Sequence, residues 1–312
     1  MPTPTKPARD WRALDAAHRR RGELVTVFFS PDGDAFEPPP KRIGVGKPFT
    51  YSDAHIEALL MVKLLLRLSL RAVEGFALGM ARIAQADWPV PNYSTLSRRE
   101  KKLDVELGSV MTEGKRHVLI VDSTGLKVFG EGEWKVRIHG TDGKRRTWRK
   151  IHLLVDRESG HVVAVETTPN DVADCHVLPA LLPAALDGDF VLGDGAYHTQ
   201  KLHRTVHAKG GTLLSAPPVT AVPWRPHHKR KDEPAFAFRN AQLTPLQRLG
   251  RTEWKMRSGY SQRSFVESTN HRLKSITGDR LSARTLDRQK AEVRLRCKAL
   301  NALAVSSRTL AQ

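Results

Sequence analysis

Two apolar runs that each lead into an aspartate constrain the fold of this chain more than any other feature of its sequence. The first run, HVLIVDST, covers residues 117–124, and the second, FVLGDGAYHT, covers residues 190–199. Apolar residues that follow one another without alternation are typical of strands buried on both faces of a sheet. We therefore expect an α/β domain in which Asp122 and Asp194 stand at the ends of two central strands.

The residues between the two runs predict more of the same sheet. The segments EWKVRIHG (133–140) and TWRKIHLLVD (147–156) flank Asp142-Gly143, a dipeptide typical of tight turns between antiparallel strands. A further strand is expected in HVVAVETTP, residues 161–169. This part of the chain therefore predicts antiparallel strands joined by short connections.

The order of the remaining elements indicates a sheet topology. DVADCHVLPALLPAAL (171–186) predicts a helix capped by Asn170 or Asp171, and a helix and a strand are expected after the second apolar run. Three antiparallel strands, a helix, a strand, a helix and a strand, followed by helices, is the order of the ribonuclease-H-like fold. In that mixed sheet with flanking helices the first and fourth strands are parallel neighbours, so Asp122 and Asp194 would meet at one edge.

The segment YSQRSFVESTNHRLK, residues 260–274, places a carboxylate among cationic and phenolic side chains. Tyr260, Glu267 and Lys274 are spaced seven residues apart, and Arg263 precedes Glu267 by one helical turn. On a single helix all four side chains would share one face. The plain alternative is an exposed helix with an Arg263–Glu267 ion pair, which would contribute about 0.5 kcal/mol and would explain neither the tyrosine nor the lysine.

Asp122, Asp194 and Glu267 form a candidate metal site. They are separated by 72 and 73 residues, and a helix crossing the sheet edge would bring Glu267 to the two aspartates. Three hard oxygen ligands without cysteine suit Mg²⁺, for which Mn²⁺ can substitute. Two such ions can activate a hydroxyl and stabilise the leaving oxygen of a phosphodiester. Each aspartate taken alone could instead be a cap or turn residue at a strand end.

The charge of the chain indicates its class of partner. Lys and Arg number 51 against 33 acidic residues, which gives a formal net charge of +18. Such an excess is typical of proteins that bind a polyanion, usually nucleic acid; a merely basic soluble protein is the alternative. Two cysteines exclude a disulfide scaffold and a cysteine-based zinc site. Because no apolar run has the length of a membrane span and no signal segment is evident, we expect an intracellular protein.

The N-terminal region predicts helices that could read DNA. From residue 51 the pattern turns helical, and a helix that follows a Pro-rich turn carries hydroxyl residues first and basic residues later. Helices joined in this way are typical of modules that enter a DNA groove; a solvated basic helix is the alternative. The candidate DNA-binding residues of this helix are Ser97, Arg98, Arg99, Lys101 and Lys102.

These motifs resemble those of a known family. VDSTGLKVFGEGEWKVRIHG, RRTWRKIHLLVD, GDGAYHT and the spacing Tyr-x2-Arg-x3-Glu-x6-Lys resemble the DDE transposases of bacterial insertion sequences, and most closely the insertion-sequence-five family. The similarity spans nearly the whole chain, including YSDAHIEALLMVKLLLRLSLRAVEGF and STLSRREKKL near its N-terminal end. The chain shows no departure at the three carboxylates or at the four spaced residues.

The resemblance implies a function and a role for each candidate residue. It implies a transposase that binds the terminal inverted repeats of its element and catalyses Mg²⁺-dependent strand cleavage and strand transfer. Glu267 would be the third metal ligand, and Tyr260, Arg263 and Lys274 would contact phosphates. The partners would be double-stranded DNA and a second copy of the chain, in the cytoplasm of a bacterium and associated with the nucleoid. The alternatives are a catalytically silent DNA-binding derivative and a ribonuclease-H-like nuclease of repair.

The resemblance also implies a domain organisation. In the insertion that family members place before the glutamate helix, Trp224 and Trp254 could stack on an unpaired base near the cleavage point, or they could simply pack. The expected domains are an N-terminal mainly α-helical DNA-binding region (1–112), a ribonuclease-H-like catalytic domain (113–285) with an insertion at about 216–256 where periodicity is lost, and a C-terminal basic helix (286–312).

Overall fold

The protein is described by a computed structural model, in which the chain falls into two compact units. Unit 1 comprises the residues up to Asp104 and those from Asn301 onwards, and unit 2 comprises Val105–Leu300. The predicted strand 133–140 and the Asp142-Gly143 turn lie outside the residues that the structure describes. Those residues are 12, 19, 50–108, 111, 114–128, 148–225 and 234–308, with only the backbone for 305–308.

The two units do not follow the predicted division at residues 112 and 285. The predicted C-terminal helix is α11 (Leu286–Arg308), and most of it belongs to unit 2. The reason is that Val293, Cys297 and Leu300 are buried in the core of that unit. Within the described part of the chain, no helix has the length and apolar character that crossing a membrane requires.

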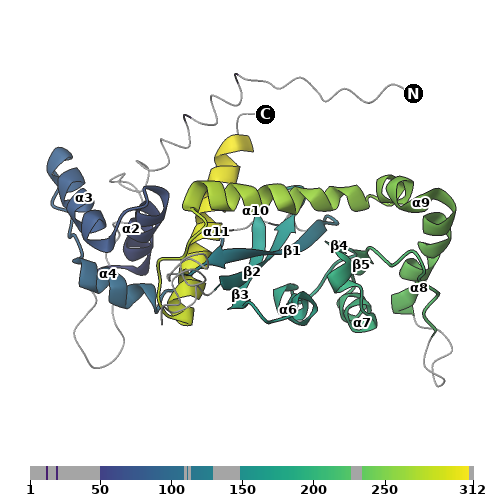
Figure 1. The fold of residues 1–312 in the computed structure, drawn as a ribbon. Helices are drawn as coiled ribbons and strands as arrows, with labels where there is room; N and C mark the ends of the chain where they lie inside the picture. The colour runs from purple at the N-terminus through teal and green to yellow at the C-terminus, as the bar shows by residue number, and fades with distance from the viewer. Residues whose placement is uncertain are drawn as a thin grey trace, which may run out of the picture. The chain divides into compact units, whose positions relative to one another are not determined.

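Unit 2 is built on a five-stranded mixed sheet with the order β3-β2-β1-β4-β5 (Figure 1). Strands β1, β2 and β3 are antiparallel to their neighbours, and β4 runs parallel to both β1 and β5. These pairings confirm the predicted mixed sheet and the parallel contact of the first and fourth strands. The strands are β1 (Val118–Lys127), β2 (Trp148–Asp156), β3 (Val162–Pro169), β4 (Phe190–Gly193) and β5 (Thr212–Ser215).

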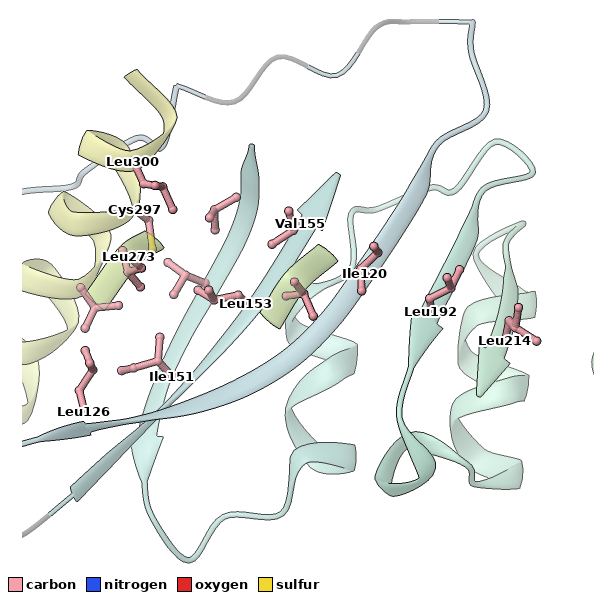
Figure 2. Close-up of a cluster of buried hydrophobic side chains, with 14 of the residues drawn as sticks. Ile120, Leu126, Ile151, Leu153, Val155, Leu192, Leu214, Leu273, Cys297 and Leu300 are labelled. Atoms are coloured by element: carbon pink, nitrogen blue, oxygen red, sulfur yellow. The ribbon is translucent and has the colours of Figure 1, made fainter. Parts of the chain in front are cut away.

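Successive apolar residues of β1 face opposite layers, as a strand buried on both faces requires. Leu119 and Val121 belong to an apolar cluster with residues of α6 (Asp174–Leu181) and α7 (Gln200–Ala208). Ile120 belongs to the cluster on the other face, with Leu273 of α10 (Ser264–Thr277) and Cys297 of α11 (Figure 2). By the same alternation Asp122 lies on the face that α10 covers.

Helix α6 is shorter than predicted. It begins at Asp174 with Ala173 at its N-cap, so neither Asn170 nor Asp171 caps it. It ends at Leu181, because Leu182 takes an extended conformation ahead of Pro183, as residues before proline usually do.

The segment 216–256 is helical in its second half, although no periodicity is evident in its sequence. It contains α8 (Pro234–Ala241) and most of α9 (Leu243–Arg257), placed between β5 and the glutamate helix. Gly250 lies inside α9 with φ 75° and ψ 169°, a conformation that favours glycine and kinks the helix. The kink changes which residues face the core, and so it interrupts the apolar pattern.

Unit 1 contains the helices predicted from residue 51 onwards. The Ser52 hydroxyl caps the first helix by accepting a hydrogen bond from the His55 N–H at 3.1 Å. A buried ion pair between Lys63 and Glu100, 3.0 Å long, ties the first helix to the third. The helices in the described residues 50–104 are α2 (Asp53–Leu65), α3 (Leu70–Ile83) and α4 (Tyr93–Glu100).

Candidate active site

Asp122 and Asp194 lie on neighbouring strands at the point where those strands separate. The last parallel pair of β1 and β4 is Ile120–Leu192, and continuing this register by two residues places Asp122 opposite Asp194. Asp194 directly follows β4, as predicted. Asp122 does not end its strand, because β1 continues to Lys127 in its pairing with β2. The two aspartates therefore lie opposite each other, as predicted, but β1 continues for five residues beyond Asp122.

The electrostatics of Asp122 show that the Asp194 and Glu267 carboxylates both act on it. The pKa of Asp122 is raised to about 6, first by burial and in addition by the negative charges of Asp194 and Glu267. The Ser123 backbone N–H and the Arg263 guanidinium oppose this rise. The Asp194 and Glu267 charges contribute less than burial does, but they can contribute only if both carboxylates lie within electrostatic reach of Asp122. The structure thus gathers three groups that lie 72 and 73 residues apart in the chain.

The turn after β4 fixes the position of Asp194. The Asp194 carboxylate accepts a hydrogen bond from the Ala196 N–H at 2.8 Å and so caps the 3-10 helix η2 (Gly195–Tyr197). The buried Tyr197 ring folds back over Gly193, where a Cβ atom would lie 2.8 Å from the ring. Because any side chain at this position would collide with Tyr197, the turn depends on glycine at residue 193.

Glu267 enters the site from the first turn of α10, and Arg263 accompanies it. The Arg263 Nη2 donates to the Glu267 carboxylate, and its Nη1 lies 3.9 Å from the Asp122 carboxylate. The Glu267 side chain is 55% exposed. The ion pair of the plain alternative is therefore present, but it belongs to the acidic cluster and is not an isolated surface pair.

The four spaced residues of segment 260–274 do not share one helix. Gly259 has φ 76°, Tyr260–Arg263 form the 3-10 helix η3, and α10 begins only at Ser264. A 3-10 turn advances three residues per turn, which directs Tyr260 into the core, where it is 5% exposed and its ring lies 5.3 Å from that of Trp254. The prediction that all four side chains share one helical face is wrong for Tyr260.

Tyr260 nevertheless remains near the acidic cluster, and Lys274 lies on the same face of α10 as Glu267. The pKa of the Tyr260 hydroxyl is raised, mainly by burial; the Asp194 charge also raises it, and the Arg263 guanidinium lowers it. The hydroxyl is thus within electrostatic reach of the site although the ring is in the core. Lys274 is half-buried on α10, two turns after Glu267 and on the same face of that helix.

Sequence reasoning misses one residue that touches the site, Asn270. Its Nδ2 donates a hydrogen bond to the Asp122 Oδ2 at 3.0 Å. The available signal is its spacing, because a residue three positions after Glu267 on a helix lies on nearly the same side. The seven-residue spacing of Tyr260, Glu267 and Lys274 does not include this position.

The donor chemistry of the cluster fits a hard divalent cation. Among the described residues, no three His, Cys, Asp or Glu side chains stand close enough to hold a metal ion by themselves. The cluster nonetheless combines Asp122 and two carboxylates that act on it with a buried amide oxygen of Asn270 that has no partner in the described part of the chain. A guanidinium already lies between two of the carboxylates. Oxygen ligands of this kind suit Mg²⁺, and Asp122, Asp194 and Glu267 would hold it.

The two tryptophans of the insertion differ in their surroundings. Trp254 is 1% exposed and packs in the core of unit 2, so the packing alternative holds for it. Trp224 is partly exposed; its ring centroid lies 4.8 Å from that of His198, and the Arg239 guanidinium lies 4.1 Å from it. Both neighbours engage the ring inside the protein. Stacking of Trp224 on a base stays a prediction.

The candidate DNA-binding residues of unit 1 are divided between structural and exposed positions. Arg99 donates to the Tyr51 carbonyl oxygen at 3.1 Å and pairs with Asp53 at 2.5 Å, so it holds α4 against the start of α2. Arg98 is exposed and bonds within its own helix. Because α4 ends at Glu100, the predicted helical positions of the following two lysines are wrong. Ser97 is half-buried, and the two exposed residues after α4 are Lys101 and Lys102.

Two family models match the chain. A model described as a transposase DDE domain matches residues 113–302, and a second model with the same description matches residues 19–131. The first match covers more than half of the chain and includes the whole sheet, the three carboxylates and the 260–274 segment. The second covers α2, α3 and α4.

Proposed function

The chain belongs to the DDE transposases, and we propose that it binds the terminal inverted repeats of an insertion sequence and catalyses Mg²⁺-dependent strand cleavage and strand transfer. The proposal includes membership of the insertion-sequence-five family. Because an element has two ends, it also includes action as a homodimer on double-stranded DNA. The observation that carries the proposal is that Asp194 and Glu267 both lie within electrostatic reach of Asp122, with Arg263 in contact with both Asp122 and Glu267.

The proposed reaction has two displacements at phosphorus. Water first attacks the phosphodiester at the end of the element; a P–O bond forms to water, the bond to the 3′ oxygen breaks, and a 3′-hydroxyl is released. That hydroxyl then attacks a phosphodiester of target DNA, whose own 3′ oxygen leaves. Mg²⁺ bound by the three carboxylates would activate the attacking oxygen and stabilise the leaving one.

Arg263, Lys274 and Tyr260 would position the phosphate that reacts. The Arg263 guanidinium lies between Asp122 and Glu267, and its planar donors match the oxygens of a phosphate as well as those of a carboxylate. Lys274 lies on the Glu267 face of α10. A polyanion brought to an acidic edge needs such cations beside the carboxylates, since phosphate contacts supply most of the affinity for DNA.

Unit 1 would recognise the ends of the element. Arg98 and Lys102 are exposed at the end of α4 and just after it, where they can contact the DNA backbone while the helix enters a groove. The net charge of +18 supports this use of the chain. Affinity for DNA should therefore fall steeply as the salt concentration rises.

The test separates cutting from binding in three variants of the full-length protein. Asp122→Asn, Asp194→Asn and Glu267→Gln should each lower cleavage of an end-containing duplex in Mg²⁺ by about 10³-fold or more. Their binding to the same duplex, measured by gel shift against a scrambled duplex, should stay close to that of the parent protein, because the cationic contacts remain.

Three other outcomes would contradict the proposal. Near-parental cleavage by one variant would remove that residue from the site. A parent protein that binds the ends but never cuts would be the silent derivative. Cleavage of any duplex without transfer of the freed 3′ end would favour a repair nuclease.

A further inference from the structure

Asn270 lies between the acidic cluster and the core of unit 2. It is 8% exposed, and its Nδ2 donates to the Asp122 Oδ2 at 3.0 Å. On α10 it follows Glu267 by three residues and precedes Lys274 by four, so its neighbours along the helix surface are these two charged groups. One amide thus borders all three charged groups from α10 and β1.

The amide oxygen of Asn270 is buried without a partner. No group in the described part of the chain donates a hydrogen bond to the Asn270 Oδ1. Buried side-chain oxygens are nearly always bonded, because leaving one unsatisfied costs about 1–3 kcal/mol. Since the nitrogen of the same amide is fixed on Asp122, the oxygen cannot turn away without losing that bond. A donor or a cation supplied from outside the protein would satisfy it.

The chemistry around the oxygen indicates what that partner is. The amide is bonded to Asp122 through only one of the two carboxylate oxygens, and the Asp194 and Glu267 charges act on that carboxylate. An anion would meet this negative charge, whereas a hydrated divalent cation brings both positive charge and water donors. A neutral amide suits such a place, because a fourth carboxylate would add repulsion.

We infer that Asn270 is a positioning residue for the divalent cation of this site. Its Nδ2 holds Asp122 in one orientation, and its Oδ1 accepts a hydrogen bond from a water molecule carried by the cation. This inference rests on the proposed function, since it requires a cation at the three carboxylates. Residues of this kind typically change metal affinity 10–100-fold when they are replaced.

The experiment measures Mn²⁺ binding by the full-length protein, with calorimetric titration and thermal melts at pH 8. Asn270→Ala should weaken Mn²⁺ binding about 10–100-fold and reduce the rise in melting temperature that Mn²⁺ causes. Asn270→Asp keeps an oxygen at the position and adds a charge. It should melt lower than the parent without metal and show a larger Mn²⁺-induced rise. The matched control is Ser268→Ala, an exposed position of α10 on the opposite side from the buried residues, and it should behave as the parent.

The outcomes distinguish this inference from the function on which it rests. A purely structural Asn270 would lower the metal-free melting temperature in both variants and leave the Mn²⁺ affinity unchanged. If Asp122→Asn loses Mn²⁺ binding while Asn270→Ala and Asn270→Asp bind like the parent, the role of Asn270 is overturned and the metal site stands. If the parent binds no Mn²⁺, or Asp122→Asn binds it equally well, the metal site itself fails, and this inference with it.

Discussion

Arginine and glutamate pair one helical turn apart on both α10 and α11, and these two pairs have different surroundings. On α11, Arg296 and Glu292 are 2% and 0% exposed. Glu292 also accepts hydrogen bonds from the Ser282 and Ala283 N–H groups, and Arg296 also donates to the Gly278 and Arg280 carbonyl oxygens. Every charge there has a partner, and the pair fastens the loop that follows α10.

Around the pair on α10, negative charges outnumber positive charges. Arg263 and Glu267 are more exposed than the α11 pair, and their cluster sets three carboxylates against one guanidinium. A buried pair in which each charge is bonded holds a structure together, whereas surplus negative charge at a sheet edge is suited to bind cations. The comparison therefore assigns stability to the pair on α11 and function to the pair on α10. Each half of that statement can be tested.

Breaking the α11 pair should produce the largest loss of stability. Arg296→Met leaves Glu292 charged in the core, and Glu292→Gln leaves Arg296 charged there. Each should lower the free energy of unfolding by about 3–5 kcal/mol, because an unpaired charge stays buried. Urea denaturation measures the change. A loss below about 1 kcal/mol in both variants would mean that the α11 pair is no more structural than a surface pair.

Breaking the α10 pair should reduce cleavage and not stability. Arg263→Ala should slow strand cleavage about 100-fold, or about 3 kcal/mol of barrier, because the phosphate is held less well. Its free energy of unfolding should change by at most about 1 kcal/mol. Arg257→Ala is the matched control, since Arg257 forms an exposed pair with Glu253 one turn earlier on α9. Equal cleavage by the two variants would contradict a role for Arg263 in the reaction.

Removing a carboxylate from the acidic cluster should stabilise the fold, the opposite of the effect on α11. Burial, with the neighbouring carboxylates adding to it, raises the folded-state pKa of Asp122 to about 6 from its ordinary value of 3.8. Its contribution to stability is therefore fully present below about pH 3.8 and is lost as the pH rises through about 6. At pH 8 without divalent metal, Asp122→Asn should raise the free energy of unfolding by about 1–3 kcal/mol. The gain should disappear near pH 3.5 in urea denaturation; a gain that is independent of pH would contradict the raised pKa of Asp122.

The smallest effect is expected at Tyr260, whose ring packs in the core and whose hydroxyl lies near the acidic cluster. Tyr260→Phe keeps the ring that packs on Trp254 and removes only the hydroxyl beside Arg263. Cleavage should fall about two- to tenfold, as for the loss of one hydrogen bond, with little change in the melting temperature. Tyr260→Ala should instead destabilise the fold by about 3–5 kcal/mol. If Tyr260→Phe destabilises as much as Tyr260→Ala, the hydroxyl serves the core and not the site.

The sequence allows the sheet of unit 2 to be predicted because its signals are strong and local. Unbroken apolar runs mark β1 and β4 as central strands, and the order of elements makes them parallel neighbours. The positions of Asp194 and Glu267 on a strand end and a helix follow from the same patterns. These predictions concern which residues face the core, which is what apolar periodicity reports.

Two predictions fail because they depend on the backbone conformation of a glycine, which the apolar periodicity of the sequence does not report. Gly259 and Gly250 both take positive φ, and they respectively set Tyr260 on a 3-10 turn and kink α9. A glycine in the sequence does not reveal which conformation it adopts. The role of Asn270 is not predicted for another reason, because it depends on a hydrogen bond to a residue 148 positions away. Such a contact exists only after the fold is formed.

That separation of 148 residues between Asp122 and Asn270 also sets the moment at which the protein can become active during synthesis. A ribosome releases the N-terminal helices first and α10 and α11 last. The three carboxylates cannot assemble before Glu267 has emerged, and the face of the sheet that holds them needs Val293, Cys297 and Leu300 from α11. A chain whose translation stops early therefore carries the helices that would recognise DNA without the means to cut it, and could only occupy the ends that a finished copy would cleave.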